Sequence, residues 1–184
     1  ITALGDLHYV EDGNNRPTVA QEFMRIIVDG TRSYRTRVIA AHNLSRIPLE
    51  SGQGPLNLEL VAIELVRLAK DMGDAYTIEP DLPHWKDSFA RLYLSFHPGK
   101  TEQDKGEGFL AQTAQRPALG KYGPIVKDSY QQILPLVRKV VFDAENVDFD
   151  KQIEQMEKWL EEHPQKSDRI SPNEDPILTS AANP

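Results

Sequence analysis

The chain of 184 residues is long enough for one domain with a hydrophobic core, and its 39% hydrophobic and 27% charged residues are typical of a folded globular protein rather than a disordered one. It contains no cysteine, which excludes disulfides, thiolate nucleophiles and cysteine-ligated metal centres. The net charge of −7 comes entirely from residues 143–184, which carry 4 basic and 11 acidic side chains, because residues 1–142 carry 17 of each sign.

The sequence leaves the cellular compartment open. No apolar run approaches the roughly 20 residues that a helix needs to cross a bilayer, and no basic-then-apolar signal segment opens the chain. The first residue is Ile1 rather than Met, so the sequence leaves open whether a targeting segment was removed. The lack of cysteine does not help, since such a chain is equally stable in oxidising and reducing surroundings.

The first 47 residues predict an arm followed by a helix. In residues 1–16 a short apolar stretch precedes the turn signal Asp12-Gly13-Asn14-Asn15, so we expect an extended N-terminal arm. Residues 17–47 predict one long helix with Pro17 in its first turn, bent or broken near Gly30. Its apolar side chains recur at helical spacing, and they are Phe23, Ile27, Tyr34, Val38 and Ala41.

The middle of the chain predicts a loop over residues 48–55 and then a central helix over residues 56–72. Apolar side chains cover most of the circumference of this helix, which indicates burial on several sides; they include Leu56, Leu58, Leu60, Val61, Ile63, Leu65, Leu68 and Met72. We expect Gly73 to end the helix and residues 75–80 to form a short extended piece.

Three more segments complete the predicted fold. Pro83 opens a third helix that ends before Pro98, and residues 99–123 form a polar connection, with at most a short helix near Phe109, that is a candidate contact segment. Pro124 opens a fourth helix, kinked at Pro135, and residues 149–162 form a fifth with an acidic outer face. Residues 164–184 contain four prolines and are interpreted as a tail.

The fold class predicted from this order is all-α: an irregular bundle of about five helices over residues 17–163, between the arm and the tail. Strand is expected only near residues 1–10 and 75–80. The expected core consists of Phe23, Ile27, Tyr34, Val38, Leu58, Val61, Leu65, Leu68, Phe89, Leu92, Tyr130, Ile133 and Val137.

No motif for catalysis, a cofactor or a metal is complete. Asp6 and His8 have the i, i+2 spacing of the first motif of metal-dependent phosphoesterases, but the further Asp, Asn and His ligands are missing. The segment from His97 to Thr101 ends like a phosphate-binding loop, yet Leu94 replaces the required glycine. None of the five histidines pairs with another at i+3 or i+4, and Asp81 is interpreted as a helix N-cap. We therefore expect no enzyme activity, cofactor or metal site.

Arginines give the strongest positive signal. Residues 1–69 contain seven Arg and no Lys, and no acidic residue lies between Asp29 and Glu50. At about 100° per residue, four side chains lie opposite the apolar stripe of the helix predicted over 17–47, with Arg37 beside that stripe. They form a candidate anion- or partner-binding face, because the guanidinium fork suits phosphates and carboxylates: Arg25, Arg32, Arg35 and Arg46. The alternative is a solvated face with local pairs such as Asp29 with Arg32.

These features predict a non-catalytic structural or interaction protein, a helical subunit that assembles with copies of itself or with other chains. One alternative is a nucleic-acid-packaging protein of the coat or nucleocapsid type that uses the arginine face, although the net charge of −7 opposes it. A second alternative is an accessory subunit of a large membrane or organellar complex, and the sequence does not separate it from the first hypothesis.

Overall fold

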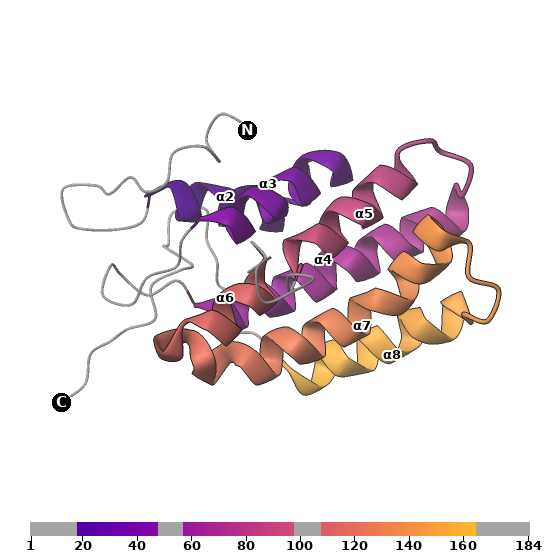
Figure 1. Ribbon diagram of the computed structural model, residues 1–184. Helices are drawn as coiled ribbons and strands as arrows, with labels where there is room; N and C mark the ends of the chain where they lie inside the picture. Colours follow the sequence, from indigo (N-terminus) through magenta and orange to yellow (C-terminus); the bar gives the residue numbers. More distant parts are fainter. Residues whose placement is uncertain (1–17, 48–56, 98–107, 165–184) are drawn as a thin grey trace.

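The computed structural model describes residues 18–47, 57–97 and 108–164, and the regular elements among them are helices (Figure 1). The prediction of an all-α bundle is confirmed. The expected arm over 1–16 with its strand, the loop over 48–55, the Asp6–His8 pair and almost all of the tail lie outside the described residues, as does most of the phosphate-loop-like segment.

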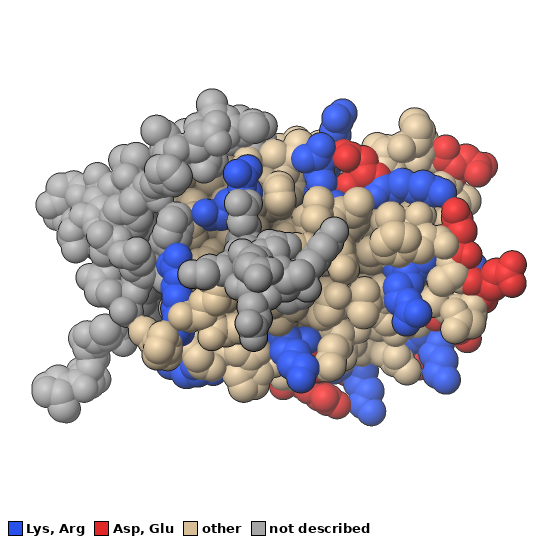
Figure 2. All heavy atoms as spheres, in the orientation of Figure 1, with Lys and Arg blue, Asp and Glu red and all other residues tan. Residues whose placement is uncertain are grey.

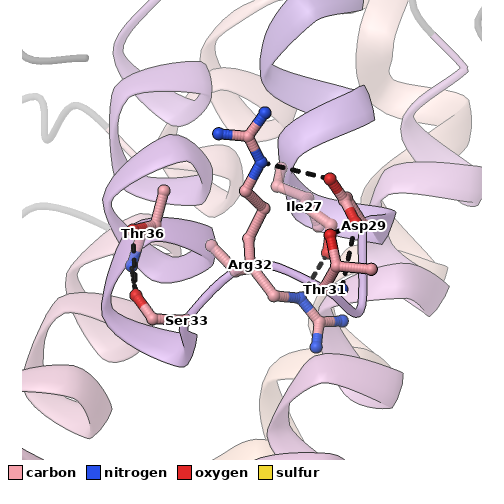
Figure 3. Close-up of polar contacts among 7 residues, drawn as sticks. Ile27, Asp29, Thr31, Arg32, Ser33 and Thr36 are labelled. Atoms are coloured by element: carbon pink, nitrogen blue, oxygen red, sulfur yellow. Dashed lines mark hydrogen bonds and ion pairs between the residues drawn. The ribbon is translucent and has the colours of Figure 1, made fainter.

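The helix expected over residues 17–47 is broken into α2 (Thr18–Val28) and α3 (Tyr34–Arg46). Figure 3 shows the link between them. The Asp29 carboxylate accepts hydrogen bonds from the backbone N–H of Thr31 at 3.0 Å and from its hydroxyl at 2.6 Å. The Ser33 hydroxyl caps α3 by accepting from the N–H of Thr36 at 3.3 Å. The Asp29 and Ser33 side chains accept hydrogen bonds from backbone N–H groups that would bond to backbone carbonyls in a continuous helix. These contacts stabilise a turn at this point.

The central helix α4 (Leu58–Ile78) corrects two expectations, because it continues through Gly73 and includes most of the piece expected to be extended. Asn57 caps its first turn by accepting from the N–H groups of Glu59 and Leu60. Gly73 is not a helix stop. The side chain of Ile153 occupies the space that a Cβ at Gly73 would fill, so the glycine allows α8 to pack closely on α4.

The remaining elements lie close to their predicted positions. They are α5 (Trp85–Ser95), α6 (Phe109–Gln115), the 3₁₀ helix η1 (Pro117–Tyr122), α7 (Gly123–Phe142) and α8 (Phe149–Glu162). The bounds of α8 are those predicted, and α7 continues past Pro135. Helix α5 begins after His84, without a side-chain cap, so Asp81 is not its N-cap. Residues 108–122 hold more helix than expected of a polar connection.

Helices α2, α3, α4, α5, α7 and α8 alternate in direction along the chain, so that α4 and α7 end where α3, α5 and α8 begin (Figure 1). Three contacts join these termini: the rings of Tyr34 and Trp85 lie 5.7 Å apart, those of Tyr76 and Phe149 lie 5.2 Å apart, and Lys86 pairs with Asp143 at 3.0 Å. At the other end, the Gln112 amide on α6 donates to the carbonyls of Ser45 and Ile47. Aromatic and ionic contacts therefore join the helices at one end of the bundle, and amide hydrogen bonds join them at the other.

The core lies between the helices, with α4 at its centre. The predicted core residues are buried there, except that Tyr34 and Tyr130 are only partly buried. Phe23, Leu65 and Phe89 have no exposed surface. At about 25 cal/mol per Å² of apolar surface removed from water, this burial is the main stabilising contribution to the fold.

Candidate functional site

The structure separates the four candidate arginines. Arg25 lies in the last turn of α2, Arg32 in the link, Arg35 in the first turn of α3 and Arg46 in its last turn. At 1.5 Å per residue, Arg46 lies roughly 16 Å from Arg35 along α3. Arg25, Arg32 and Arg35 therefore surround the turn between α2 and α3, and we call these three the arginine corner. Arg46 belongs to the opposite end of the bundle.

Two members of the arginine corner form local ion pairs. Arg25 lies 3.7 Å from Glu22, and Arg32 lies 3.1 Å from Asp29. Hydrogen bonds from Thr31, followed by that from Arg32, lower the pKa of Asp29. The local pair between Asp29 and Arg32 is thus present, as the solvated-face alternative requires. Arg35 is exposed and has no ion-pair partner among the described residues.

Arg37, which the sequence placed beside the apolar stripe, is buried and structural. Its Nε donates to the carbonyl oxygen of Ile27 at 2.7 Å, and its Nη1 lies 3.5 Å from the carboxylate of Asp71 on α4. The first contact satisfies a carbonyl at the C-terminal end of α2, which has no partner within the helix. Arg37 therefore joins α2, α3 and α4.

A second buried charge lies about two turns before Asp71 on α4. Glu64 is 4% exposed and pairs with Arg67 at 3.5 Å, while its Oε1 has no hydrogen-bond partner among the described residues. Burial raises the pKa of Glu64, and burial also raises that of Asp71 against the opposing effect of Arg37. A raised carboxyl pKa suits a general acid. These groups nevertheless lie between packed helices rather than in a cleft, so we assign them to the fold.

A groove of about 390 Å³ runs between α7 and α8. Its walls carry amide and cationic side chains, including Gln131, Arg138, Lys151, Gln152 and Gln155. Gln152 donates to the carbonyl of Gln132 at 3.0 Å and so ties the two helices together. The groove holds no nucleophile with an adjacent base, and no group of three His, Asp or Glu side chains among the described residues is placed to hold a metal ion.

The most unusual surface lies at the end where α4 passes into α5 and α7 into α8. Ile78 is 79% exposed, Phe142 66% and Leu82 38%. We call this surface, with residues 78–85 and 142–150, the tip. The sequence did not reveal it, because its apolar residues come from two separate turns. One available signal was the run Val140-Val141-Phe142, since three consecutive apolar side chains on a helix cannot all face the core.

An aromatic cluster lies at the start of α5, where the tip meets that helix. The ring of Trp85 lies 5.7 Å from that of Tyr34, 6.1 Å from Tyr76 and 6.3 Å from Phe89. Its indole Nε1 donates to the carbonyl of Glu79 at 2.8 Å, which fixes the turn between α4 and α5. The tip is thus held by packed rings and by a side-chain hydrogen bond.

Acidic side chains lie within the tip and beside it, and we call them the acidic rim. Residues 74–87 contain four acidic side chains and one basic one, and residues 143–150 contain four acidic side chains and no basic one. Figure 2 shows acidic side chains at this end of the molecule. Lys86 is paired with Asp143, and Asp148 caps α8 by accepting from the N–H of Lys151. An apolar centre with an acidic rim can bind a protein surface of complementary charge.

Comparison with known proteins identifies no relative. No family model matches the sequence, and no curated protein or solved structure matches it significantly. None of the described helices is both long and apolar enough to cross a membrane.

Proposed function

We propose that the protein is a non-catalytic helical interaction subunit and that the tip is the surface by which it docks onto a protein. The observation that carries this proposal is the exposure of Ile78, Leu82 and Phe142 at one end of the bundle. Large exposed apolar patches are rare on monomeric proteins and mark interaction sites. Protein interfaces commonly have an apolar centre and a polar rim, which is the arrangement at the tip.

The acidic rim favours a protein over a nucleic acid at this surface. Glu79, Asp81 and Glu145 are exposed there, and each would repel phosphate groups. The same charges would attract a basic protein surface and speed its encounter with the tip. The rim therefore selects the sign of the partner's charge, while the apolar centre contributes the area removed from water.

Site-specific photo-crosslinking tests the proposal. A photoreactive side chain would replace Phe142 in one sample and Leu94 in another, because Leu94 is also an exposed apolar residue, at 42%, and lies near the other end of α5. We expect position 142 to yield one defined crosslinked protein that position 94 does not. Identical crosslinking patterns from the two positions would reject the tip as a docking surface.

A paired substitution provides a second test. We expect Ile78→Ser with Phe142→Ser to weaken the binding of this chain to the protein crosslinked from position 142 about tenfold or more, because the apolar centre is lost. The free energy of unfolding should change by less than about 1 kcal/mol for the pair, since both side chains are largely exposed. Leu94→Ser is the matched control. Unchanged association of the paired variant, measured by sedimentation, would contradict the proposal.

Nucleic-acid packaging is the second candidate, and one observation favours it. Residues 108–142 contain five basic side chains and one acidic one. The acidic residue, Asp128, accepts a hydrogen bond from the indole of Trp159 at 2.6 Å and is partly buried. This basic strip differs from the arginine face that the sequence suggested. The accessory role in a large membrane or organellar complex uses the same docking surface as the first proposal, and the identity of the crosslinked protein would decide between them.

A further inference from the structure

We infer that the tip binds a second copy of this chain, in a two-fold arrangement in which the arginine corner of each copy faces the acidic rim of the other. The inference rests on the proposed function, because it names the partner of the docking surface. It goes further in requiring that both halves of the contact come from the same end of the bundle.

The arginine corner and the acidic rim do lie at the same end. Tyr34, the neighbour of Arg35 in the first turn of α3, contacts Trp85 at the start of α5 with ring centroids 5.7 Å apart. The next residue, Lys86, contacts Asp143 at the end of α7 at 3.0 Å. Helix α5 thus lies between α3 and α7, as Figure 1 shows.

With α5 between α3 and α7, this order places Arg35 on one side and Glu145 on the other. Arg35 lies in the first turn of α3, Ile78 and Leu82 lie at the turn from α4 to α5, and Phe142 and Glu145 lie at the end of α7 and in the turn after it. A two-fold axis through the middle of such an arrangement brings each side onto the opposite side of the other copy. The apolar residues then meet around the axis, and the contact closes at two copies instead of continuing into a filament.

Complementary charges without local partners support this arrangement. Arg35 and Glu145 are both exposed, and neither has an ion-pair partner among the described residues. The charges that would face one another in the pair are therefore available on both sides. Their attraction should set the register of the two copies, while the apolar centre makes the contact less sensitive to salt than a purely ionic one.

Reciprocal charge reversal tests the inference. Sedimentation velocity over a range of protein concentrations should show a monomer–dimer equilibrium for the wild-type chain. We expect Arg35→Glu and Glu145→Arg each to weaken dimerisation about tenfold or more, because like charges then face one another twice. An equimolar mixture of these two variants should regain dimerisation, since opposite charges face one another at both contacts of the mixed pair.

Matched controls are available in α8. Lys158→Glu and Glu161→Arg make the same changes of charge on exposed side chains in the last turns of that helix, away from the tip. Neither should change the dimerisation constant by more than about twofold. Thermal melting of all four variants would verify that each is folded, which we expect because the substituted side chains are exposed.

The outcomes separate this inference from the proposed function. A wild-type chain that stays monomeric, or a mixture that fails to regain dimerisation, would overturn the inference. Crosslinking from position 142 to a different protein, with the chain itself monomeric, would overturn the inference and leave the proposed docking surface in place. Crosslinking to a second copy, lost in Arg35→Glu and regained in the mixture, would establish both.

Discussion

Gly108 lies where the chain meets the C-terminal end of α5, and its N–H donates to the carbonyl of His97 at 3.2 Å. A Cβ at Gly108 would collide with backbone atoms of Phe96 and His97, which cannot rotate away. We therefore expect Gly108→Ala to lower the free energy of unfolding by about 1–3 kcal/mol, the usual cost of overpacking.

Gly120 gives the control for this substitution. A Cβ at Gly120 would meet no atom, so Gly120→Ala should change stability by less than about 0.5 kcal/mol. Urea unfolding of both variants measures the difference. Equal stabilities of the two variants would mean that Gly108 does not pack closely against the backbone of Phe96 and His97.

Glu64 predicts a dependence of stability on pH. Because burial raises its pKa in the folded chain, the folded state binds the proton at a higher pH than the unfolded state does. The contribution of Glu64 to stability is therefore most favourable below the unfolded pKa, and it is lost as the pH rises through the folded pKa. Glu64→Gln should flatten this part of the profile and raise the melting temperature at neutral pH relative to the wild-type chain.

Arg67, the ion-pair partner of Glu64, provides a second substitution for comparison. Arg67 lies 3.5 Å from Glu64 and, as a cation, opposes the rise in its pKa. Arg67→Gln should therefore steepen the loss of stability with rising pH, whereas Glu64→Gln should reduce it. If the stability of Glu64→Gln falls with rising pH as steeply as that of the wild-type chain, Glu64 is not the source of this pH dependence.

Single residues show what periodicity identifies and what it does not. The three-four spacing located Phe23, Leu65 and Phe89 in the core, because burial follows the apolar face of a helix. It did not identify Arg37 as buried, because the partners of Arg37 are a carbonyl in α2 and a carboxylate in α4. Contacts between helices far apart in the sequence are invisible to a one-helix pattern.

Whole helices were predicted well where local and global preferences agree. Helix α8 has its Asp148 cap, an apolar seam and a proline after its end, and its predicted bounds are confirmed. Helix α4 departs from its prediction at Gly73. The glycine resembles a stop signal in the sequence, but its role is to admit Ile153 from α8, and only the packed structure reveals that role.

The central position of α4 gives a prediction about stability. Leu65 has no exposed surface, so Leu65→Ala should cost about 2–5 kcal/mol, as for other buried leucines. Ile78→Ala removes a similar volume from the same helix, but Ile78 is 79% exposed. Its cost should stay below about 1 kcal/mol. Thermal or urea unfolding that ranked the two variants equally would contradict the central position of α4.

At the scale of the whole molecule, the fold class could be predicted and the candidate site could not. The helical spacing of apolar residues predicts the all-α bundle, because each helix buries its own apolar face in the core. The tip forms where the turn before Trp85 meets the end of α7, and the arginine corner lies across α5 from it. Only the antiparallel order of the helices brings these turns together, and that order cannot be obtained from spacing within each helix.

The arginines provide the prediction that separates the leading functions. Arg35 and Arg46 share α3 but lie near opposite ends of it, so they form a matched pair for substitution. If the arginine corner meets acidic side chains of another subunit, Arg35→Ala should weaken assembly several-fold and Arg46→Ala should not. In that case neither RNA nor DNA should bind at low salt, and the ratio of absorbance at 260 nm to that at 280 nm should be that of pure protein.

Phosphate binding would give a different result. The affinity for nucleic acid would fall steeply with salt, because each neutralised phosphate releases counterions. Each of Arg25→Ala, Arg32→Ala, Arg35→Ala and Arg46→Ala would then reduce the salt slope by about one contact. Arg25 and Arg32 already pair with Glu22 and Asp29, so in this chain phosphate would have to displace a carboxylate at each of those two positions. We therefore expect the arginine corner to bind a protein rather than phosphate. Loss of nucleic-acid binding in the arginine variants, with assembly intact, would reverse this ranking.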